Sequence, residues 1–469
     1  MTVENMTADS KKEKINEIRA EILKRIRPTD AEKTKLETIR KGVIDDIARI
    51  AQEQGQCDIL PLSVGSAERN TWLHGNHDID VFISYPEDIS FDEFHKRSRL
   101  LLMAMAKTGD SWEDRHSEHP YIHIKKEGFE IDLVPCFRVK SGADIKSAVD
   151  RTPFHCAYIK ENISGLEDDV LMMKQFMKGT GVYGSEVRTG GFSGYLTEIL
   201  TIYYGGFVGV LEHASNWKHG TVIDMADHQT LEHENPLVVV DPTDPKRNVA
   251  AALSLTKFAL FIDRARTFLK SPSLDYFTPK SYPPMTAAEF EKTMTARGTG
   301  MIGISFQTPP KAEDTLYPQL FRMEKSLEEL LTRNEFTVVN TFSWAEAGGK
   351  SIVFVELLST VLPPLQKRVG PPVWNAENAE SFCKKYKNNP STFSFAIENE
   401  RYAAEIPRKY KTAEYLIEDM IFKETALGRH VRDSMKNGYE VLREKEIMEV
   451  KGDPFWKFMN EKLTAQIKP

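Results

Sequence analysis

Two short segments with acidic residues at every second position place the strongest constraint on the fold of this chain. The first, Asp78–Ser84, reads DIDVFIS, and the second, Phe129–Pro135, reads FEIDLVP. Side chains alternate between the two faces of a β-strand, so each segment predicts a strand with apolar residues on one face and carboxylates on the other. If the two strands are neighbours, Asp78, Asp80 and Asp132 share one face of a sheet.

Carboxylates that crowd together repel one another unless a cation is bound among them. Hard oxygen ligands favour Mg²⁺, which proteins commonly bind together with substrate phosphates. Two such ions about 4 Å apart can activate a hydroxyl and stabilise the leaving oxygens of a phosphoryl transfer. Taken alone, however, alternating acids are more often the solvent-exposed face of an ordinary strand than a metal site.

A Gly-Ser turn upstream of the first segment favours a metal site over an ordinary solvent-exposed strand. Gly65-Ser66 comes shortly before Asp78 and opens a predicted short helix. Free N–H groups at such a turn and the serine hydroxyl can hold phosphate oxygens, and Arg69 can add a charge-assisted contact. Each of these features alone is weak evidence. Their combination is specific: a Gly-Ser turn, an arginine, D-x-D and a later strand carboxylate follow one another in this order. The combination predicts a site for phosphates and divalent cations.

Hydrophobic periodicity divides the 469 residues into three predicted regions. Residues 1–142 begin with two amphipathic helices and continue with strand 78–84, a helix over 91–106 and a hairpin around Glu127-Gly128. Residues 143–270 are predicted to be mainly helical. Residues 271–469 start with a proline-rich boundary, 271–284, and mix helices with strands, which gives an α+β fold class. The predicted strands of this last region are 301–306, 336–344, 352–358, 393–397 and 402–406.

Composition limits the environment and the partners of the chain. A net charge of −7 argues against nonspecific coating of nucleic acid, although a local basic groove remains compatible with it. Four scattered cysteines without a C-x-x-C pair predict neither a disulfide framework nor a structural zinc site, which fits a reducing cytoplasm. The most apolar stretch, 196–211, contains Glu198 and two glycines and is predicted to be a buried helix and not a membrane span. No secretory signal is predicted.

Beyond these patterns, the motifs resemble a known family. Gly-Ser, D-x-D and a third strand carboxylate resemble the DNA polymerase β-type nucleotidyltransferase superfamily. Longer matches resemble the archaeal (class I) CCA-adding tRNA nucleotidyltransferases, from about residue 12 to beyond 440. They are GSAERNTWL (65–73), DVF (80–82), DLVPC (132–136), SAVDRTPFH (147–155), RTGGFSG (188–194) and RNVAA (247–251).

This resemblance implies a fold and an activity. The fold would be a polymerase β-like nucleotidyltransferase domain with a mixed sheet and helices, a helical central domain that completes the nucleotide site, and an α+β C-terminal region that binds tRNA. The activity would be template-independent addition and repair of the 3′-terminal C, C and A of tRNA. The substrates would be CTP, ATP and tRNA, the cofactor Mg²⁺ and the product pyrophosphate. The resemblance also implies a homodimer.

The resemblance further assigns roles to individual residues. Asp78 and Asp80 would bind both metal ions, and Asp132 would bind the ion that activates the tRNA 3′-hydroxyl. The family position taken by Asp78 is often glutamate, and either carboxylate can hold Mg²⁺. Ser66 and Arg69 would hold the triphosphate. The other implied nucleotide-binding residues are His155, Lys174 and Tyr183, toward phosphates or sugar, and Arg247, toward the base.

Contacts with tRNA phosphates require clustered Lys and Arg residues. Three candidate clusters lie beyond the proline-rich boundary, at 384–387, 408–411 and 429–432, and for any one of them a solvated surface is as good an interpretation as an RNA contact. We expect the C-terminal region to hold the acceptor and T-stem minihelix of tRNA by shape.

Two other functions stay open at this point. One is a poly(A)- or oligoadenylate-synthesising nucleotidyltransferase with the same metal chemistry but another acceptor. The other is a noncatalytic tRNA-binding protein of the same fold, against which the presence of all three carboxylates counts. A P-loop kinase is disfavoured because the chain has no G-x-x-x-x-G-K-[ST] loop.

Overall fold

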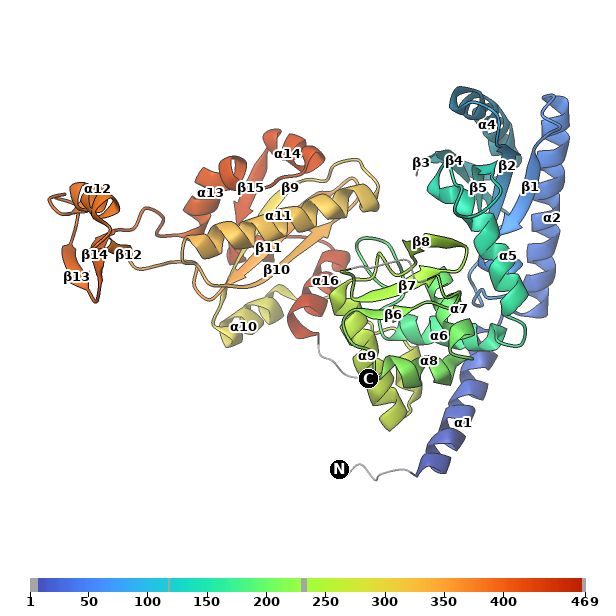
Figure 1. The fold of residues 1–469 in the computed structure, drawn as a ribbon, viewed down its shortest axis with the longest axis horizontal. Helices are drawn as coiled ribbons and strands as arrows, with labels where there is room; N and C mark the ends of the chain where they lie inside the picture. The colour runs from blue at the N-terminus through green and yellow to red at the C-terminus, as the bar shows by residue number, and fades with distance from the viewer. Residues whose placement is uncertain (1–6, 117–118, 229–233, 466–469) are drawn as a thin grey trace. The chain divides into compact units, whose positions relative to one another are not determined.

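The computed structural model describes residues 7–116, 119–228 and 234–465 (Figure 1). It contains two compact units, one ending at Lys280 and the other beginning at Ser281. This division falls inside the proline-rich segment 271–284.

The first unit opens with two helices, α1 (Ala8–Ile26) and α2 (Asp30–Glu53). Thr29 separates them, because its side chain accepts a hydrogen bond from the Glu32 amide while the Glu32 carboxylate accepts one from the Thr29 amide. Such a capping box satisfies free N–H groups at a helix start. The two predicted amphipathic helices are therefore confirmed.

A five-stranded mixed sheet follows, in the order β1-β2-β5-β4-β3. A short helix, α3 (Gly65–Glu68), connects the first two strands, and the chain leaves β2 through α4 (Phe91–Met105) and a 3₁₀ turn, η1 (Ala106–Thr108). Strands β2 and β5 pair in parallel and the other neighbours are antiparallel. The strands are β1 (Leu60–Val64), β2 (Asp78–Pro86), β3 (Ser111–His116), β4 (Pro120–Lys126) and β5 (Phe129–Arg138). The predicted strand, helix and hairpin are confirmed, whereas β1 and β3 were not predicted.

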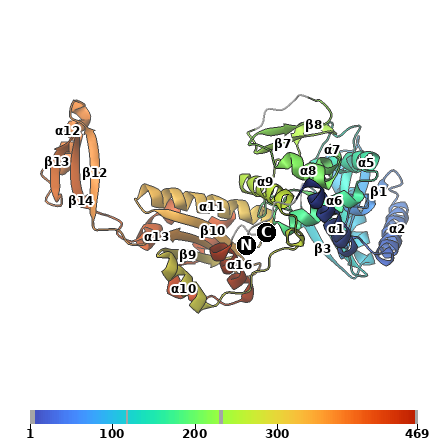
Figure 2. The same cartoon turned by 90° about the horizontal axis from the view of Figure 1, so that it is seen from below.

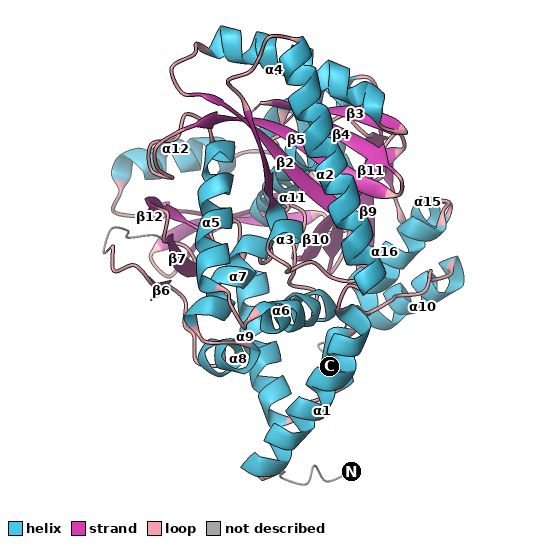
Figure 3. Cartoon of the chain, turned by 90° about the vertical axis from the view of Figure 1, so that its right-hand side faces the viewer, coloured by secondary structure: helices cyan, strands magenta, loops and turns pink. Residues whose placement is uncertain are grey.

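The two faces of this sheet have different environments. Helices α2 and α4 cover one face (Figure 3), where Ile79, Val81 and Leu133 are almost fully buried. The opposite face carries the acidic residues near the start of β2, and further along the strands Phe82 and Cys136 pack there in a small apolar cluster. The alternation predicted from the sequence is thus realised in both strands.

The remainder of the first unit is mainly helical, as predicted, but it also contains a three-stranded sheet that was not predicted. Its helices are η2 (Ala148–Arg151), α5 (Thr152–Asn162), α6 (Glu167–Gly179), α7 (Gly194–Tyr203), α8 (Phe207–Ala214), α9 (Leu255–Lys270) and η3 (Leu274–Phe277). Its strands are β6 (Thr221–Ile223), β7 (Leu237–Asp241) and β8 (Asp244–Asn248), in the order β6-β7-β8.

The prediction of a single helix over 196–211 is wrong. Helix α7 ends at Tyr203, and α8 begins at Phe207. The break lies at Gly205 and Gly206, whose φ angles of 70° and 123° fall in a region that side chains disfavour. The Asp169 carboxylate accepts a hydrogen bond from the Phe207 amide and so stabilises the start of the second helix.

Helix α6 lies at the centre of this region, and α1 packs along it (Figure 2). Arg19 of α1 forms a bidentate ion pair with Asp169, with N–O distances of 2.6 and 2.7 Å. Phe176 of α6 is fully buried within a group of aromatic rings at centroid distances of 5.4–6.4 Å, namely Phe207, Phe261, Phe268, Tyr276 and Phe277.

The second unit contains two separate sheets. A four-stranded sheet has the order β10-β11-β9-β15, and a three-stranded sheet has the order β12-β14-β13. The strands are β9 (Gly300–Gln307), β10 (Val338–Ala345), β11 (Lys350–Leu357), β12 (Leu365–Pro372), β13 (Ser394–Glu398), β14 (Arg401–Pro407) and β15 (Tyr439–Leu442). The helices are α10 (Ala287–Arg297), α11 (Glu313–Arg333), α12 (Ala376–Tyr386), α13 (Ala413–Glu424), α14 (Arg429–Lys436), α15 (Glu444–Met448) and α16 (Asp453–Thr464). All five predicted strands are present, and the α+β class is confirmed; β12 and β15 were not predicted.

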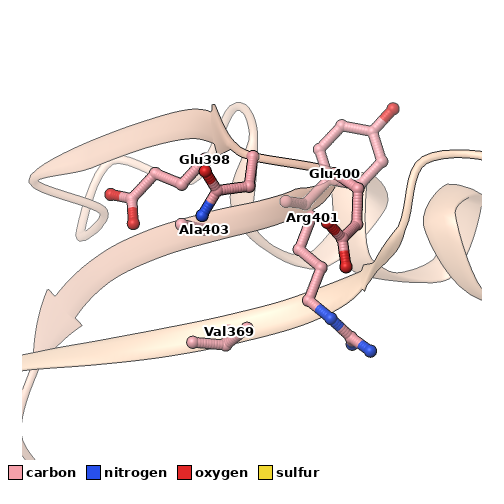
Figure 4. A pocket seen from close by; sticks show the side chains of 7 residues that line it. Val369, Glu398, Glu400, Arg401 and Ala403 are labelled. Carbon is pink, nitrogen blue, oxygen red and sulfur yellow. The ribbon is translucent and has the colours of Figure 1, made fainter.

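A pocket of about 170 Å³ lies on the three-stranded sheet, where Glu398, Glu400 and Arg401 surround it (Figure 4). The Arg401 guanidinium donates a hydrogen bond to the Gly370 carbonyl across the sheet. None of the predicted site residues lines this pocket. Within the described residues, no helix combines the length and the apolar character needed to cross a membrane.

We predict that Phe176→Ala lowers the free energy of unfolding by about 3–5 kcal/mol, because it removes a buried ring and leaves a cavity among five aromatic neighbours. Urea unfolding followed by circular dichroism measures the change. Phe321→Ala is the control: this ring is 38% exposed, and its loss should cost less than about 1 kcal/mol. Equal losses for the two variants would contradict the assignment of the core.

Candidate active site

Parallel pairing of β2 and β5 brings the predicted carboxylates together. In this register Asp80 lies opposite Asp132, and Asp78 lies opposite Glu130. All four side chains project from the sheet face that α2 and α4 leave uncovered, because their neighbours Ile79 and Ile131 belong to the core on the other face.

Burial and mutual repulsion make it costly for these groups to be charged together. Burial, together with the charges of Asp132 and Asp78, raises the pKa of Asp80 to about 6, although Arg69 opposes the shift. Burial and the charges of Glu130 and Asp132 likewise raise the pKa of Asp78. A cation bound here would relieve both effects, so hard oxygen donors and surplus negative charge fit a divalent metal ion.

His123 holds the third carboxylate. It lies on β4 directly opposite Asp132, and its Nδ1 is 2.7 Å from an Asp132 carboxylate oxygen. The ring is buried, and its Nε2 atom is buried without a hydrogen-bond partner. Sequence reasoning missed His123, although alternation along 121–126 places it on the carboxylate face, since Ile122 and Ile124 face the core.

Gly65 allows the phosphate-loop candidate to approach the carboxylates. Its φ angle is 75°, and a Cβ atom at this position would lie 1.9 Å from an Asp80 carboxylate oxygen. Ser66 follows in α3 and is half-buried, and its carbonyl accepts a hydrogen bond from the Thr71 amide over 3.0 Å. The Gly-Ser turn therefore borders the carboxylates directly, and only glycine fits at its first position.

Behind this turn, one buried carboxylate holds two of the predicted cations. Glu198 of α7 is fully buried, with its Oε2 2.9 Å from Arg69 Nη2 and its Oε1 3.2 Å from Lys174 Nζ. Lys174 also donates to the Thr71 carbonyl over 2.8 Å, and the Thr71 hydroxyl donates to Glu198. Sequence reasoning placed Glu198 in a buried helix and assigned it no role.

Burial and charge act in opposite directions within this group. Burial lowers the pKa of Lys174, and Glu198 counteracts that effect. Burial alone would raise the pKa of Glu198, but Lys174 and Arg69 outweigh it and lower that pKa.

Tyr183 lies beside the same group. A Cβ atom at Gly194 would be 3.2 Å from the Tyr183 hydroxyl and 3.9 Å from Lys174 Nζ, so both side chains border this glycine. Burial raises the pKa of Tyr183, which keeps its hydroxyl protonated as a donor. The ammonium of Lys178 lies 5.5 Å from the centre of its ring.

A second buried carboxylate, Asp241, organises the remaining two predicted residues. Its Oδ2 is 2.9 Å from His155 Nε2 and 2.7 Å from Arg247 Nη1. Tyr195 donates its hydroxyl to the other oxygen over 3.2 Å and stacks on the His155 ring at 4.0 Å. Burial lowers the pKa of His155, and the contacts with His155, Thr243 and Arg247 hold the pKa of Asp241 well below its usual range against the effect of burial.

Three known family models match this chain in succession. They are described as a nucleotidyltransferase domain, over residues 44–155, the second domain of tRNA nucleotidyltransferase, over 168–278, and the C-terminal domain of CCA-adding enzymes, over 297–444. The first match includes Asp78, Asp80 and Asp132, and the second includes Lys174 and Glu198.

Curated relatives match over nearly the whole chain. The CCA-adding enzyme of Methanosarcina mazei is 47% identical over 95% of this chain and 98% of that protein. The chain belongs to the family of CCA-adding enzymes. The corresponding enzyme of Methanothermobacter thermautotrophicus is 39% identical over 90% of this chain and 92% of that protein. The resemblance inferred from the motifs is confirmed, together with the nucleotidyltransferase class and the polymerase β-like catalytic fold.

The C-terminal part of this CCA-adding family member places its three basic clusters in different environments. Arg408 is buried and pairs with Glu335 over 2.7 Å, and the Lys409 ammonium pairs with Asp419. The basic side chains of cluster 384–387 are exposed, and those of cluster 429–432 are exposed or half-buried. Arg408 is therefore structural, whereas Lys409 and Lys411 of the same cluster are exposed, so all three clusters keep basic side chains at the surface.

Within the described part of the chain, no three His, Cys, Asp or Glu side chains form a ready set of metal ligands. Asp132 interacts with His123, and Asp78 accepts a hydrogen bond from Asn76.

We predict that Gly65→Ala lowers nucleotide incorporation at least about 100-fold, because the new methyl group displaces Asp80. Gly75→Ala is the matched control: its φ angle is 77°, but a Cβ atom there meets nothing within 4 Å. Both variants carry a similar backbone strain of about 1–2 kcal/mol, so only Gly65→Ala should lose activity when incorporation of labelled nucleotide into tRNA is measured. Equal activity in both variants would contradict the close approach of Gly65 to the Asp80 carboxylate.

Proposed function

We propose that this chain adds C, C and A to the 3′ end of tRNA, with CTP and ATP as substrates and pyrophosphate as the leaving product. The observation that carries the proposal is the pairing of Asp80 with Asp132 on the sheet face opposite α2 and α4, beside a Gly-Ser turn whose first position has room only for glycine. Membership in the CCA-adding family supports tRNA as the acceptor.

Nucleotidyltransferases of this family generally use divalent metal ions. We propose Mg²⁺, held by Asp78, Asp80 and Asp132. When bound, the ions neutralise phosphate charge and activate the attacking 3′-hydroxyl. His123 orients Asp132 through the 2.7 Å contact, as side chains beside metal ligands commonly do.

In this proposal the nucleotide lies between the metal-binding carboxylates and two groups of residues, one held by the buried Glu198 and the other by the buried Asp241. Ser66 and Arg69 hold the triphosphate, with Lys174 as a further cation and Tyr183 as a hydroxyl donor. His155 and Arg247, fixed by Asp241, contact the sugar and the base. Planar guanidinium donors suit selection of a base edge. Catalysis is then mostly positioning and charge neutralisation.

The two other candidate functions have less support. Poly(A) or oligoadenylate synthesis shares the carboxylate chemistry, but the matched C-terminal model and the curated relatives are of CCA-adding enzymes. A noncatalytic tRNA-binding protein would not need the crowded carboxylates. The acceptor and T-stem minihelix as the bound part of tRNA, a homodimer and a cytoplasmic location remain predictions.

Incubation of the protein with Mg²⁺, labelled CTP and ATP, and a tRNA that lacks its terminus tests this function. We expect a product that ends after C, C and A. Asp80→Asn should lower incorporation by about 10³-fold or more while tRNA affinity stays close to wild type, because the substitution removes a metal ligand and no RNA contact.

Asp88→Asn is the control, since this exposed carboxylate lies just beyond the end of the same strand. An extended A tract would favour poly(A) synthesis, and tRNA binding without pyrophosphate release would favour the noncatalytic alternative. An Asp80→Asn enzyme with normal activity would contradict the metal role.

The raised pKa of Asp80 predicts a pH-dependent requirement for Mg²⁺. Protons compete with the metal once the pH falls below about 6, so the Mg²⁺ concentration for half-maximal activity should rise up to about tenfold for each further pH unit. Above that pH the requirement should be flat. Incorporation rates measured against Mg²⁺ at several pH values test the prediction, and a flat requirement across the acidic range would contradict it.

A further inference from the structure

Glu198 is a fully buried carboxylate that joins two cations from separate elements. Arg69 follows α3 and Lys174 lies in α6. Both contact the side chain of Glu198, which lies in α7. The carboxylate itself lies behind the residues proposed to meet the nucleotide. Its position indicates that it acts on the nucleotide through its neighbours.

The two cations need this partner to remain charged where they are. Lys174 is 3% exposed, and burial disfavours its ammonium form. Arg69 stays charged under any condition, so its charge further disfavours a proton on Lys174. Glu198 is the anion that opposes both effects, although the pKa of Lys174 stays below its ordinary value.

We propose that Glu198 is the positioning residue that keeps Lys174 protonated and fixes Arg69 for the triphosphate. The proposal rests on the proposed function, because it assumes that these two cations meet nucleotide phosphates. Glu198 leaves the group with a net charge of +1, one cation in excess, to attract a polyphosphate. A neutral residue in its place would let Lys174 lose its proton, and the phosphates would then face Arg69 alone.

The other groups that face this cluster do not produce the same pH response. Burial raises the pKa of Tyr183 and of Cys156, which contacts Arg69, so both stay neutral up to alkaline pH. Lys178 is half-buried one helical turn beyond Lys174, and its pKa is lowered by burial, with Asp78 opposing. Lys178 is present in wild type and variants alike, so a comparison between them separates its effect from that of Lys174.

The test is the pH profile of the KM for CTP and for ATP. In wild type we expect the KM to be nearly constant from about pH 7 to about pH 9. In Glu198→Gln it should rise with pH, by up to about tenfold for each unit above the pKa of Lys174. A second variant, K174R/E198Q, should remove the pH dependence, because a guanidinium keeps its proton throughout this range.

Glu356→Gln is the matched control for lost stability. Glu356 is also fully buried and pairs with Arg297 through N–O distances of 2.7 and 2.9 Å, but it lies in the second unit. Its loss should destabilise the protein without changing the pH profile of the KM. Glu198→Asp, which keeps the carboxylate, should restore a flat profile even if kcat stays low.

Two outcomes would overturn the proposal. One is a flat KM profile in Glu198→Gln, and the other is a slope that persists in K174R/E198Q. If Glu198→Gln does not fold, the comparison of Glu198→Asp with wild type still decides, since a slope in the aspartate variant would contradict the role of the carboxylate charge. Failure of the proposed function is distinguishable, because the wild-type protein itself would then add no C or A.

Discussion

Repulsion among carboxylates on one face of the mixed sheet is the constraint on which the rest of the site depends. Asp80 and Asp132 lie side by side because β2 and β5 pair in parallel with their apolar residues on the same side. A slip of one residue would bury these charges and expose Ile79 and Val81, so the core fixes the register. The same pairing that stabilises the sheet therefore concentrates negative charge at the site, and a bound cation would make that concentration favourable.

The cationic residues of the site are held in place by a different kind of interaction. Each group of predicted nucleotide-binding residues is held by a buried carboxylate, Glu198 for Arg69 and Lys174, and Asp241 for the second group. A buried anion of this kind costs desolvation energy and returns little net stability. What it provides is orientation, because cations that already have fixed positions lose little entropy when a triphosphate binds.

Local patterns were sufficient for the strands and for the open face, because alternation within one segment determines which way Asp78 and Asp80 point. They were insufficient for Glu198 and Asp241, since Arg69 and His155 lie far from these carboxylates in sequence; Arg247 is only six residues from Asp241, but no repeating pattern links the two. Strands β6–β8 were missed because they are short and lie within a mainly helical region. The break between α7 and α8 falls at Gly205-Gly206; these glycines counted against a membrane span, but the helix end that they permit was not predicted.

Basic runs show why charge in a sequence does not by itself indicate an RNA surface. The run 408–411 directs Arg408 into the interior, where Glu335 and main-chain carbonyls use its donors. The run 429–432 behaves differently, because Val431 and Met435 of α14 pack into the core and turn Arg429 outward. For a chain with a net charge of −7, attraction to tRNA must come from such local groups of free cations, so the packing of each helix decides which basic residues remain available to phosphates.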